Sequence, residues 1–409
     1  MADPALAAES TGAIPEHVPP SLVIPFDFYS DPLFSTDPFD AIRWQRTDAP
    51  RIFYSPTHYM FPGGWVITRA EDIRYVQQNA ELFSSREQVS FAALLGEAWD
   101  LIPLEVDPPR HKLYRTLLNP LFSPKEIARL ECGVQESADN LISKFASLGG
   151  TEFVRSFAQA FPVSVFLRLM GLPIEEMPTF LDWEKGLLKS FNLETRRSSA
   201  RSITDYLRRV IISRRKQPGE DLISRIVVGQ VDGRALNDEE VIGICFLLFI
   251  AGLDTVASSL GFHFRHLAAD TALQSQLRAD RTLIPAAVEE FLRIYSIVIS
   301  HRRVAKDTEI AGVTMKKGDW ISVPTANGSR DAREFSDPDT FKLDRDSNRH
   351  VAFSYGIHRC IGSHLARREF VVAINRWFDL IPPFELKPGS SVKTVGGAVF
   401  GVEEMHLVW

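Results

Sequence analysis

The stretch FSYGIHRCIG, residues 353–362, contains Cys360, one of only three cysteines in the chain. Glycines flank the cysteine at positions 356 and 362, and glycine permits close backbone approach to a flat ligand. Residues 363–381 form an amphipathic pattern without proline, which predicts a helix directly after the cysteine. The N-terminus of a helix favours thiolate over thiol. The stretch therefore predicts a cysteine that can serve as the sole protein ligand of a cofactor.

Two other interpretations of Cys360 remain open at this point. Most free cysteines are small buried hydrophobes. Alternatively, His358, Cys360 and His364 could hold a metal ion, but no fourth ligand lies close by in the sequence, which disfavours structural zinc.

Composition limits the classes of protein to which the chain can belong. The chain has 409 residues, 45% of them hydrophobic, and 28 phenylalanines, which predicts a globular protein with a large core. Three scattered cysteines do not make a disulfide framework, so we expect a cytoplasmic location. A net charge of −6 disfavours nucleic acid as a partner. The N-terminal residues lack a signal-peptide pattern, and the longest apolar run, residues 241–253, is too short to span a bilayer, so no membrane association is expected.

The order of patterns along the chain predicts a mainly α, helix-rich single domain with a minor β portion. Residues 1–40 are rich in proline and aspartate and are expected to be irregular, with the domain itself spanning 41–409. Asp107 is a plausible N-cap, with Pro108 and Pro109 in the first turn of a helix. Helical patterns then dominate up to about residue 300, including a helix of about 30 residues that begins after Asn237. From residue 301 the pattern alternates, as short antiparallel strands do.

The spacing F-x-x-G-x-H-x-C-x-G in residues 353–362 resembles the haem-binding loop of the cytochrome P450 family. The resemblance extends over nearly the whole chain from about residue 40. It implies the triangular P450 fold, haem b as the cofactor, and Cys360 as the axial iron ligand, a thiolate that assists O–O cleavage. It also implies that Glu290 and Arg293, which lie at i and i+3, form the family's buried structural ion pair, and that Arg345 joins that pair.

The segment FIAGLDTVASS, residues 249–259, places a carboxylate and a hydroxyl in an apolar helix. Thr255 can donate to the carbonyl of Ala251 and open the helix locally, while the small residues Ala251 and Gly252 permit close approach. Taken alone, a core helix with an exposed Asp254 is the simpler interpretation. The P450 resemblance implies instead that Asp254 and Thr255 are the acid–alcohol pair that delivers protons during oxygen activation.

Several cations are expected to contact the haem propionates. In DPPRHKLYR, His111 and Arg115 lie four residues apart on one helix face, which suits an anionic partner, although a solvated basic face is the ordinary explanation. The resemblance implies that both contact propionates together with Arg302 and His358. Arg303 competes with Arg302 for this role, and Ser300 stands where related enzymes have an aspartate.

Within the family, GEAWDLIPLEVDPPRHKLYR (96–115), AGLDTVASSL (251–260) and CIGSHLARREF (360–370) are similar to the bacterial camphor monooxygenase group. Where that group places a tyrosine that bonds the camphor carbonyl, this chain has Trp99. A compact apolar pocket for a small terpenoid-like molecule is implied, and camphor itself is not expected. The residues implied to face the substrate are Trp99, Leu101, Leu104, Leu247, Ile250, Ala251, Val298 and Val399.

The same resemblance implies the partners. A monomeric terminal oxygenase would receive electrons from a [2Fe–2S] ferredoxin and its reductase, and a basic patch of Arg74, Lys112, Arg115 and Arg367 would steer the acidic ferredoxin. Two alternatives are a peroxide-driven peroxygenase and a haem carrier or gas sensor without enzyme activity. The first tends to replace the acid–alcohol pair by an arginine, and the second needs no proton relay.

Overall fold

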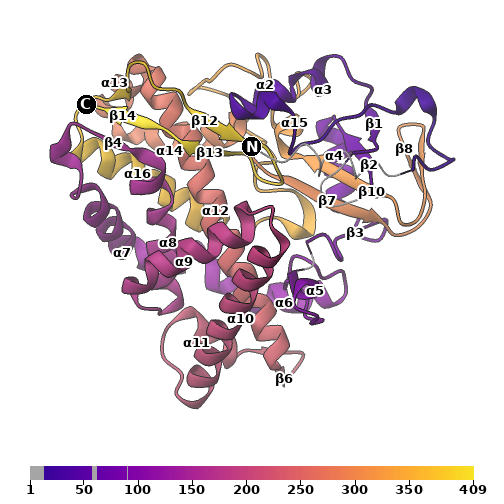
Figure 1. Ribbon diagram of the computed structural model, residues 1–409, viewed down its shortest axis with the longest axis horizontal. Coiled ribbons are helices and arrows are strands. Elements are labelled where there is room, and N and C mark those ends of the chain that lie inside the picture. The colour runs from indigo at the N-terminus through magenta and orange to yellow at the C-terminus, as the bar shows by residue number, and fades with distance from the viewer. Residues whose placement is uncertain (1–12, 58–61, 90) are drawn as a thin grey trace. The chain divides into compact units, whose positions relative to one another are not determined.

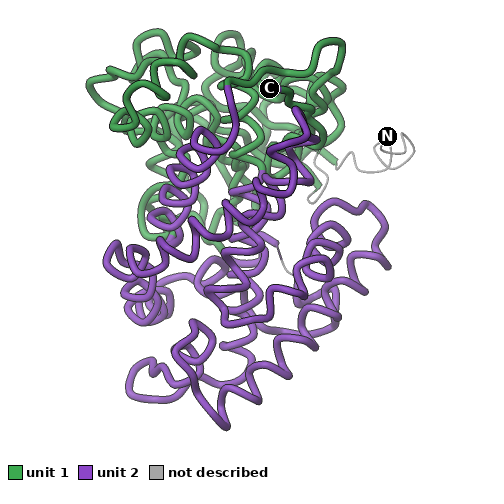
Figure 2. Tube along the Cα trace, turned by 90° about the vertical axis from the view of Figure 1, so that its left-hand side faces the viewer, with its two compact units in different colours: residues 1–85, 258–360, 383–408 green, residues 86–257, 361–382, 409 purple. Residues whose placement is uncertain are grey.

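The computed structural model describes residues 13–57, 62–89 and 91–409, and its chain forms two compact units. Unit 1 comprises residues 1–85, 258–360 and 383–408, and unit 2 comprises residues 86–257, 361–382 and 409 (Figure 2). The first 12 residues of the predicted irregular segment lie outside the described residues. The rest of that segment contains two short 3-10 helices and the helix that begins at Pro38.

Unit 1 is built around a five-stranded sheet with the strand order β1-β2-β10-β7-β3 (Figure 1). Strand β10 runs parallel to β2 and antiparallel to β7. The strands of unit 1, in this sheet and outside it, are β1 (Ile52–Ser55), β2 (Gly64–Ile67), β3 (Phe83–Ser84), β7 (Ile299–Val304), β8 (Thr308–Ile310), β9 (Val313–Met315), β10 (Trp320–Pro324), β11 (Glu385–Leu386), β12 (Lys393–Val395), β13 (Gly401–Glu404) and β14 (His406–Val408). The helices of unit 1 are η1 (Pro20–Leu22), η2 (Pro32–Ser35), α2 (Pro38–Ala41), α3 (Arg43–Thr47), α4 (Ala70–Gln78), α13 (Thr271–Ala279), η8 (Arg281–Leu283), α14 (Ile284–Ile294), α15 (Thr325–Ser329) and η9 (Gly356–His358).

Unit 2 is almost entirely helical. Its elements are α5 (Phe91–Leu94), α6 (Arg110–Leu118), η3 (Asn119–Phe122), α7 (Pro124–Ile142), η4 (Ala146–Leu148), β4 (Gly150–Glu152), η5 (Val154–Ala158), α8 (Ala160–Met170), η6 (Ile174–Glu176), α9 (Met177–Glu184), η7 (Lys185–Lys189), α10 (Leu193–Lys216), α11 (Leu222–Val227), β5 (Gln230–Val231), β6 (Arg234–Ala235) and α16 (Ser363–Leu380). Helix α16 packs on α7, where Arg376 Nε lies 2.6 Å from Asp139 Oδ1 and the Trp377 ring meets the Phe153 ring edge-on at 5.2 Å.

The long helix α12 (Asp238–Ala269) has 32 residues, which confirms the length predicted from the sequence. Its start is fixed by a reciprocal capping box: Asn237 Oδ1 accepts from the Glu240 N–H at 2.8 Å, and Glu240 Oε2 accepts from the Asn237 N–H at 2.9 Å. The helix is long and apolar enough to cross a membrane, but 67% of its most apolar window is buried inside the protein, so it packs as a core helix. Residues 238–257 of α12 belong to unit 2 and the remainder to unit 1.

One predicted helix start is wrong. Helix α6 begins at Arg110, so Pro108 and Pro109 precede it instead of forming its first turn. The backbone carbonyl of Asp107 accepts a hydrogen bond from the His111 N–H at 3.1 Å. Asp107 therefore contributes to this end of the helix through its main-chain carbonyl.

Unit 1 contains a buried network centred on Glu290. Arg293 donates to both Glu290 oxygens at 2.8 Å, and the two side chains are 0% and 1% exposed. Arg345 Nε joins them at 3.1 Å, as expected, and Asn348 donates from its amide at 3.1 Å. The remaining Arg293 donors reach backbone carbonyls of residues 329, 338 and 340. The guanidinium thus cross-links α14 to the loop that follows α15.

Replacing Arg293 by alanine should lower the free energy of unfolding by about 3–5 kcal/mol, because Glu290 would stay buried without its main cation. Thermal and urea denaturation measure this loss. Arg43→Ala is the matched control, since Arg43 pairs with Asp40 at the same i,i+3 spacing but is 52% exposed. We expect that control to change stability by no more than about 1 kcal/mol. Equal losses in the two variants would contradict a special role for the buried pair.

Candidate functional site

Cys360 lies in a tightly turned loop of unit 1. The loop passes through η9, and the Cys360 N–H donates to the carbonyl of Phe353 at 2.9 Å, which closes it across seven residues. Cys360 is exposed, whereas Cys245 in α12 is fully buried, and burial raises the pKa of the Cys245 thiol to about 12. Cys245 therefore fits the description of a buried hydrophobe, and Cys360 does not.

Gly356 is needed where the loop meets α4. Its φ is +70°, and a Cβ atom built on it would lie 2.4 Å from the carbonyl oxygen of Gln77 in α4. Only glycine permits this close approach between the loop and the backbone of α4. Helix α4 acts as a fixed support for the cysteine loop.

Strand β7 places several predicted residues on one face. Because side chains alternate along a strand, Ser300 and Arg302 share a face and Arg303 lies on the other. Arg302 is 2% exposed, while Arg303 is exposed, with its guanidinium 5.5 Å from the centroid of the Trp320 ring. In the described part of the chain, the buried hydroxyl of Ser300 has no hydrogen-bond partner. A buried cation beside an unsatisfied hydroxyl suits an anionic group.

Unit 1 also contains three other residues that the sequence assigned to the site. His358 is buried at the end of η9. Val298 and Val399, predicted to face the substrate, form an isolated antiparallel β-bridge with each other. The structure therefore brings together two substrate-facing candidates that lie 101 residues apart in the sequence.

In unit 2, His111 and Arg115 lie one turn apart on α6, as the sequence predicts. His111 is 3% exposed, and burial, assisted by the charge of Arg115, lowers its pKa to about 4, with Asp107 opposing the shift. Burial thus disfavours the charged form of His111, and Arg115 is the permanent cation of this face.

The pair Asp254 and Thr255 lies in the unit 2 part of α12. Thr255 Oγ1 donates to the carbonyl of Ala251 at 2.8 Å, which confirms the predicted back-bond. Asp254 is 8% exposed and forms an ion pair with Lys189 of η7. The simpler interpretation of Asp254 as a solvated aspartate is therefore wrong, because a lysine from another element holds it.

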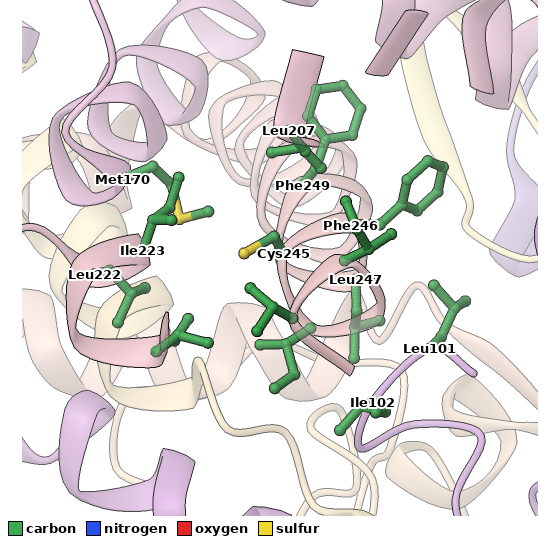
Figure 3. Close-up of a cluster of buried hydrophobic side chains, with 14 of the residues drawn as sticks. Leu101, Ile102, Met170, Leu207, Leu222, Ile223, Cys245, Phe246, Leu247 and Phe249 are labelled. Carbon is green, nitrogen blue, oxygen red and sulfur yellow. The ribbon is translucent and has the colours of Figure 1, made fainter. Parts of the chain in front are cut away.

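The predicted substrate residues of unit 2 gather at one hydrophobic cluster. Trp99, Leu101 and Leu247 are buried members, and Leu104 and Ile250 pack against it. Figure 3 shows Leu101 and Leu247 in this cluster, with Leu101 on the loop beside α12. A Cβ atom on Gly243 would lie 2.1 Å from the Asp100 carbonyl oxygen, so only glycine lets this loop lie on the helix. Ala251 is exposed on α12.

The indole of Trp99 already has an acceptor. Its Nε1–H donates to Glu97 Oε2 at 2.6 Å, and Arg208 of α10 contacts the same oxygen at 2.7 Å. The Trp99 ring lies 5.0 Å from the ring of Phe246. The tryptophan thus attaches the loop to α10 and contributes an apolar ring to the cluster.

Sequence reasoning missed four acidic or basic residues around these groups. Glu97 accepts a hydrogen bond from the Trp99 indole. Glu105 accepts hydrogen bonds from the backbone N–H groups of Val89 and Leu101 and so connects two parts of the segment before α6. Lys189 pairs with Asp254, and Glu184 is 6% exposed, with burial raising its pKa to about 7. For Glu105 a signal existed, since it is the single charge in the apolar run LIPLEV. The pairing of Lys189 with Asp254 and that of Arg208 with Glu97 join segments far apart in the chain.

Comparison with known proteins decides the family. The family profile described as "Cytochrome P450" matches residues 166–395. The chain is 41% identical over 405 residues to a probable cytochrome P450 127A1 of Sinorhizobium fredii, covering 98% of this chain and 97% of that protein. The chain belongs to the cytochrome P450 family. It is also 31% identical, over 89% of its length and 92% of the relative, to a vitamin D3 dihydroxylase of Streptomyces griseolus.

Solved P450 structures share the fold. The crystal structure of CYP101J2 matches with a TM-score of 0.88 and 36% identity, covering 97% of this chain and 99% of that one. CYP101C1 matches with the same TM-score and 33% identity, covering 97% and 100%. These two structures bear out the resemblance to the camphor monooxygenase group and the P450 fold class. The protein is a P450 monooxygenase, and the cofactor of this family is haem.

The residues in place fit that cofactor. Unit 1 offers an exposed thiol at Cys360, a buried guanidinium at Arg302 and the unsatisfied Ser300 hydroxyl. Among residues 13–57, 62–89 and 91–409, no group of three or more His, Cys, Asp or Glu side chains could hold a metal ion. A single thiolate ligand to haem iron needs no such group, so the donor set agrees with haem.

Proposed function

We propose that this P450 hydroxylates a small, apolar, terpenoid-like substrate, using O₂ and two electrons from a [2Fe–2S] ferredoxin and its reductase. The overall change is R–H + O₂ + 2e⁻ + 2H⁺ giving R–OH and water. The observation that carries the proposal is the exposed Cys360 in a loop with the haem-binding spacing, held against α4 at Gly356. We further propose that the enzyme is a cytoplasmic monomer.

The proposed haem contacts come from the P450 resemblance, and charge and burial support them. Cys360 would ligate the iron, and the bound haem would supply oxygen activation and electron storage. Arg302 and His358 in unit 1, and Arg115 and His111 in unit 2, would receive the two propionates. The burial of Arg302 and exposure of Arg303 support Arg302 as the contact, and Ser300 would donate beside it. His111 would donate to a propionate from its ring nitrogen, and the charge of that propionate would oppose the effect of burial, which lowers the pKa of the ring.

Asp254 and Thr255 would handle the two protons. Thr255 donates its hydroxyl proton to the Ala251 carbonyl, so its Oγ1 remains available as an acceptor on the exposed side of α12. Asp254 is the nearest carboxylate along the helix and is held by Lys189, whose side chain is 29% exposed. This lysine gives the carboxylate a contact with solvent through which protons can be replaced.

The substrate class is supported by the apolar cluster of unit 2 and by Trp99. Because the Trp99 N–H is engaged by Glu97, it offers no donor to a substrate carbonyl. Val298 and Val399, which form a β-bridge within unit 1, are also aliphatic. Binding should therefore depend on shape and apolar area, and we expect a ketone and the corresponding hydrocarbon to bind with similar affinity.

The test is reconstitution of the full chain with haem, a [2Fe–2S] ferredoxin, its reductase and NADH. A panel of monoterpenoids is first screened by the spin-state change of the ferric haem, and the binders are then incubated and analysed for products. We expect hydroxylated product that depends on NADH and ferredoxin. Product from hydrogen peroxide alone at a comparable rate would establish a peroxygenase instead. Haem binding without turnover on any substrate would favour the carrier or sensor.

The proposed ferredoxin surface gives a further prediction. Arg74 contributes little free charge, because both its terminal nitrogens bond to Glu334. Lys112 and Arg115 of α6 and Arg367 of α16 remain the proposed contacts in unit 2. Replacing Lys112 by glutamate reverses the charge at this position. The variant should be reduced by ferredoxin about tenfold more slowly than the wild type at low salt, and the two rates should converge as ionic strength rises.

Stopped-flow reduction measures this rate. Lys144→Glu, the same charge change at an exposed lysine after α7, is the control and should have little effect. Equal rates for the wild type and Lys112→Glu at low salt would contradict the docking surface.

A further inference from the structure

In unit 2, the segment that carries Trp99 is held to α10 at two points. Arg197 Nε donates to the carbonyl of Leu94, the last residue of α5, at 3.0 Å, and Arg208 donates to Glu97 Oε2 at 2.7 Å. The two arginines lie eleven residues apart in α10, which is close to three helical turns, so they lie on the same face of that helix. One face of α10 therefore holds the chain on both sides of its turn at residues 95–96.

A single carboxylate oxygen of Glu97 receives two donors. Glu97 Oε2 accepts from the Trp99 indole N–H at 2.6 Å as well as from Arg208. Hydrogen bonds to a charged acceptor are shorter and stronger than those to a neutral one. Burial raises the pKa of Glu97, but the hydrogen bonds from Arg208 and Trp99 outweigh it and leave the pKa below its usual value. The indole N–H is thus engaged by a carboxylate that an arginine stabilises.

The ring of Trp99 belongs to the hydrophobic cluster, although its N–H does not bond there. Trp99 is 6% exposed, and its ring centroid lies 5.0 Å from that of Phe246, which also lies 5.6 Å from the Phe91 ring. Figure 3 shows Phe246 in this cluster together with Leu101. An indole has one polar group, a donor, and a buried donor without an acceptor is costly. Without Glu97, a ligand oxygen that reached this N–H would gain from bonding it.

We propose that Glu97 determines the substrate selectivity of this enzyme by withholding the Trp99 N–H from the substrate. A carbonyl group on the substrate then gains nothing from the indole, and the ring contributes only apolar area. Arg208 is a positioning residue that acts through Glu97. This inference rests on the proposed function, in which Trp99 faces the substrate.

The hydrogen bond is tested without substrate by NMR of the full, haem-loaded chain in its reduced carbon monoxide form, with ¹⁵N in the indole rings. The chain has seven tryptophans, and the signal of Trp99 is the one that Trp99→Phe lacks. We expect the Trp99 N–H proton to shift upfield in Glu97→Met, because methionine has similar length but is only a weak acceptor. Arg208→Met leaves the acceptor in place and should cause a smaller shift in the same direction.

The selectivity is tested with camphor, a ketone, and bornane, the hydrocarbon with the same skeleton. The spin-state change of the ferric haem gives a Kd for each, and the two values should be similar in the wild type. In Glu97→Met, camphor should gain about fivefold over bornane, because its oxygen can accept the freed N–H. Glu97→Gln keeps an acceptor and should retain the wild-type ratio. The double variant Glu97→Met/Trp99→Phe has no N–H to offer and should also return to that ratio.

Glu194→Met is the matched control. Glu194 pairs with Arg197 of the same helix but is 75% exposed, so this variant should leave the NMR signal of Trp99 and the ratio of Kd values unchanged. If Glu97→Met does not fold, Glu97→Ala carries the same predictions.

The outcomes separate this inference from the proposed function. Loss of affinity for both ligands by the same factor would show that Glu97 only supports the loop, and would overturn the inference. A gain for camphor that persists in the double variant would overturn it as well. The expected NMR shifts in a protein that hydroxylates no terpenoid would contradict the proposed function, and with it the selectivity, while the hydrogen bond itself would stand.

Discussion

Replacing Cys360 by alanine is expected to abolish hydroxylation completely and to remove the spectral signature of a thiolate-ligated haem. The sulfur would be the only protein ligand to the iron, and no neighbouring side chain in the loop offers another thiolate. Haem that remains bound through Arg302, His358 and the apolar surfaces should show the spectrum of a weak or imidazole ligand. Absorption spectra of the ferric and carbon-monoxide-bound ferrous forms, with haem content measured separately, make the comparison.

Cys132→Ala is the matched control for this experiment. Cys132 is also exposed but lies in α7, outside the loop with the haem-binding spacing. We expect this variant to retain the wild-type spectrum and activity. A Cys360→Ala protein that keeps the thiolate spectrum, or a Cys132→Ala protein that loses it, would contradict the assignment of the iron ligand.

Replacing Thr255 by alanine is the second change with a large expected effect. The variant should still oxidise NADH, but product per NADH should fall by about tenfold or more, with hydrogen peroxide formed in its place. The reason is that Thr255 Oγ1 is held by the Ala251 carbonyl in a position where it can pass or stabilise a proton. Without that hydroxyl, O₂ takes up two electrons and two protons and leaves as peroxide. Parallel assays of NADH, peroxide and product measure the partition.

Two controls separate the hydroxyl from the helix geometry. Thr255→Ser keeps the hydroxyl and should restore most of the coupling. Thr204→Ala removes an equivalent back-bond to Ala200, also 2.8 Å long, from α10 and should leave coupling unchanged. Intact coupling in Thr255→Ala would remove this residue from the proposed proton path.

The features that the sequence predicted correctly are local ones. The helix start at Asn237, the back-bond of Thr255 and the Glu290–Arg293 pair each join residues at most four positions apart. Their geometry follows from helix periodicity alone, so the residue pattern determines it. The cysteine loop was recognised for a similar reason, since its five fixed positions fall within ten residues.

The features that the sequence could not predict depend on distant segments. Lys189 lies 65 residues from Asp254, and Arg208 lies 111 residues from Glu97. The lowered pKa of His111 follows from its burial, which no local pattern reports. The strict need for glycine at 356 comes from the backbone of Gln77, which reaches the loop only through the tertiary fold. Each of these required knowledge of which elements pack together.

The absorption spectrum of the carbon monoxide adduct of the reduced, haem-loaded full chain tests whether Cys360 ligates the iron. A thiolate at Cys360 predicts the absorption maximum of a thiolate-ligated haem, and the Cys360→Ala variant should lack it. A maximum typical of an imidazole-ligated haem in the wild type, or a protein that stays colourless after haem is supplied, would show that Cys360 is not the ligand of a haem iron.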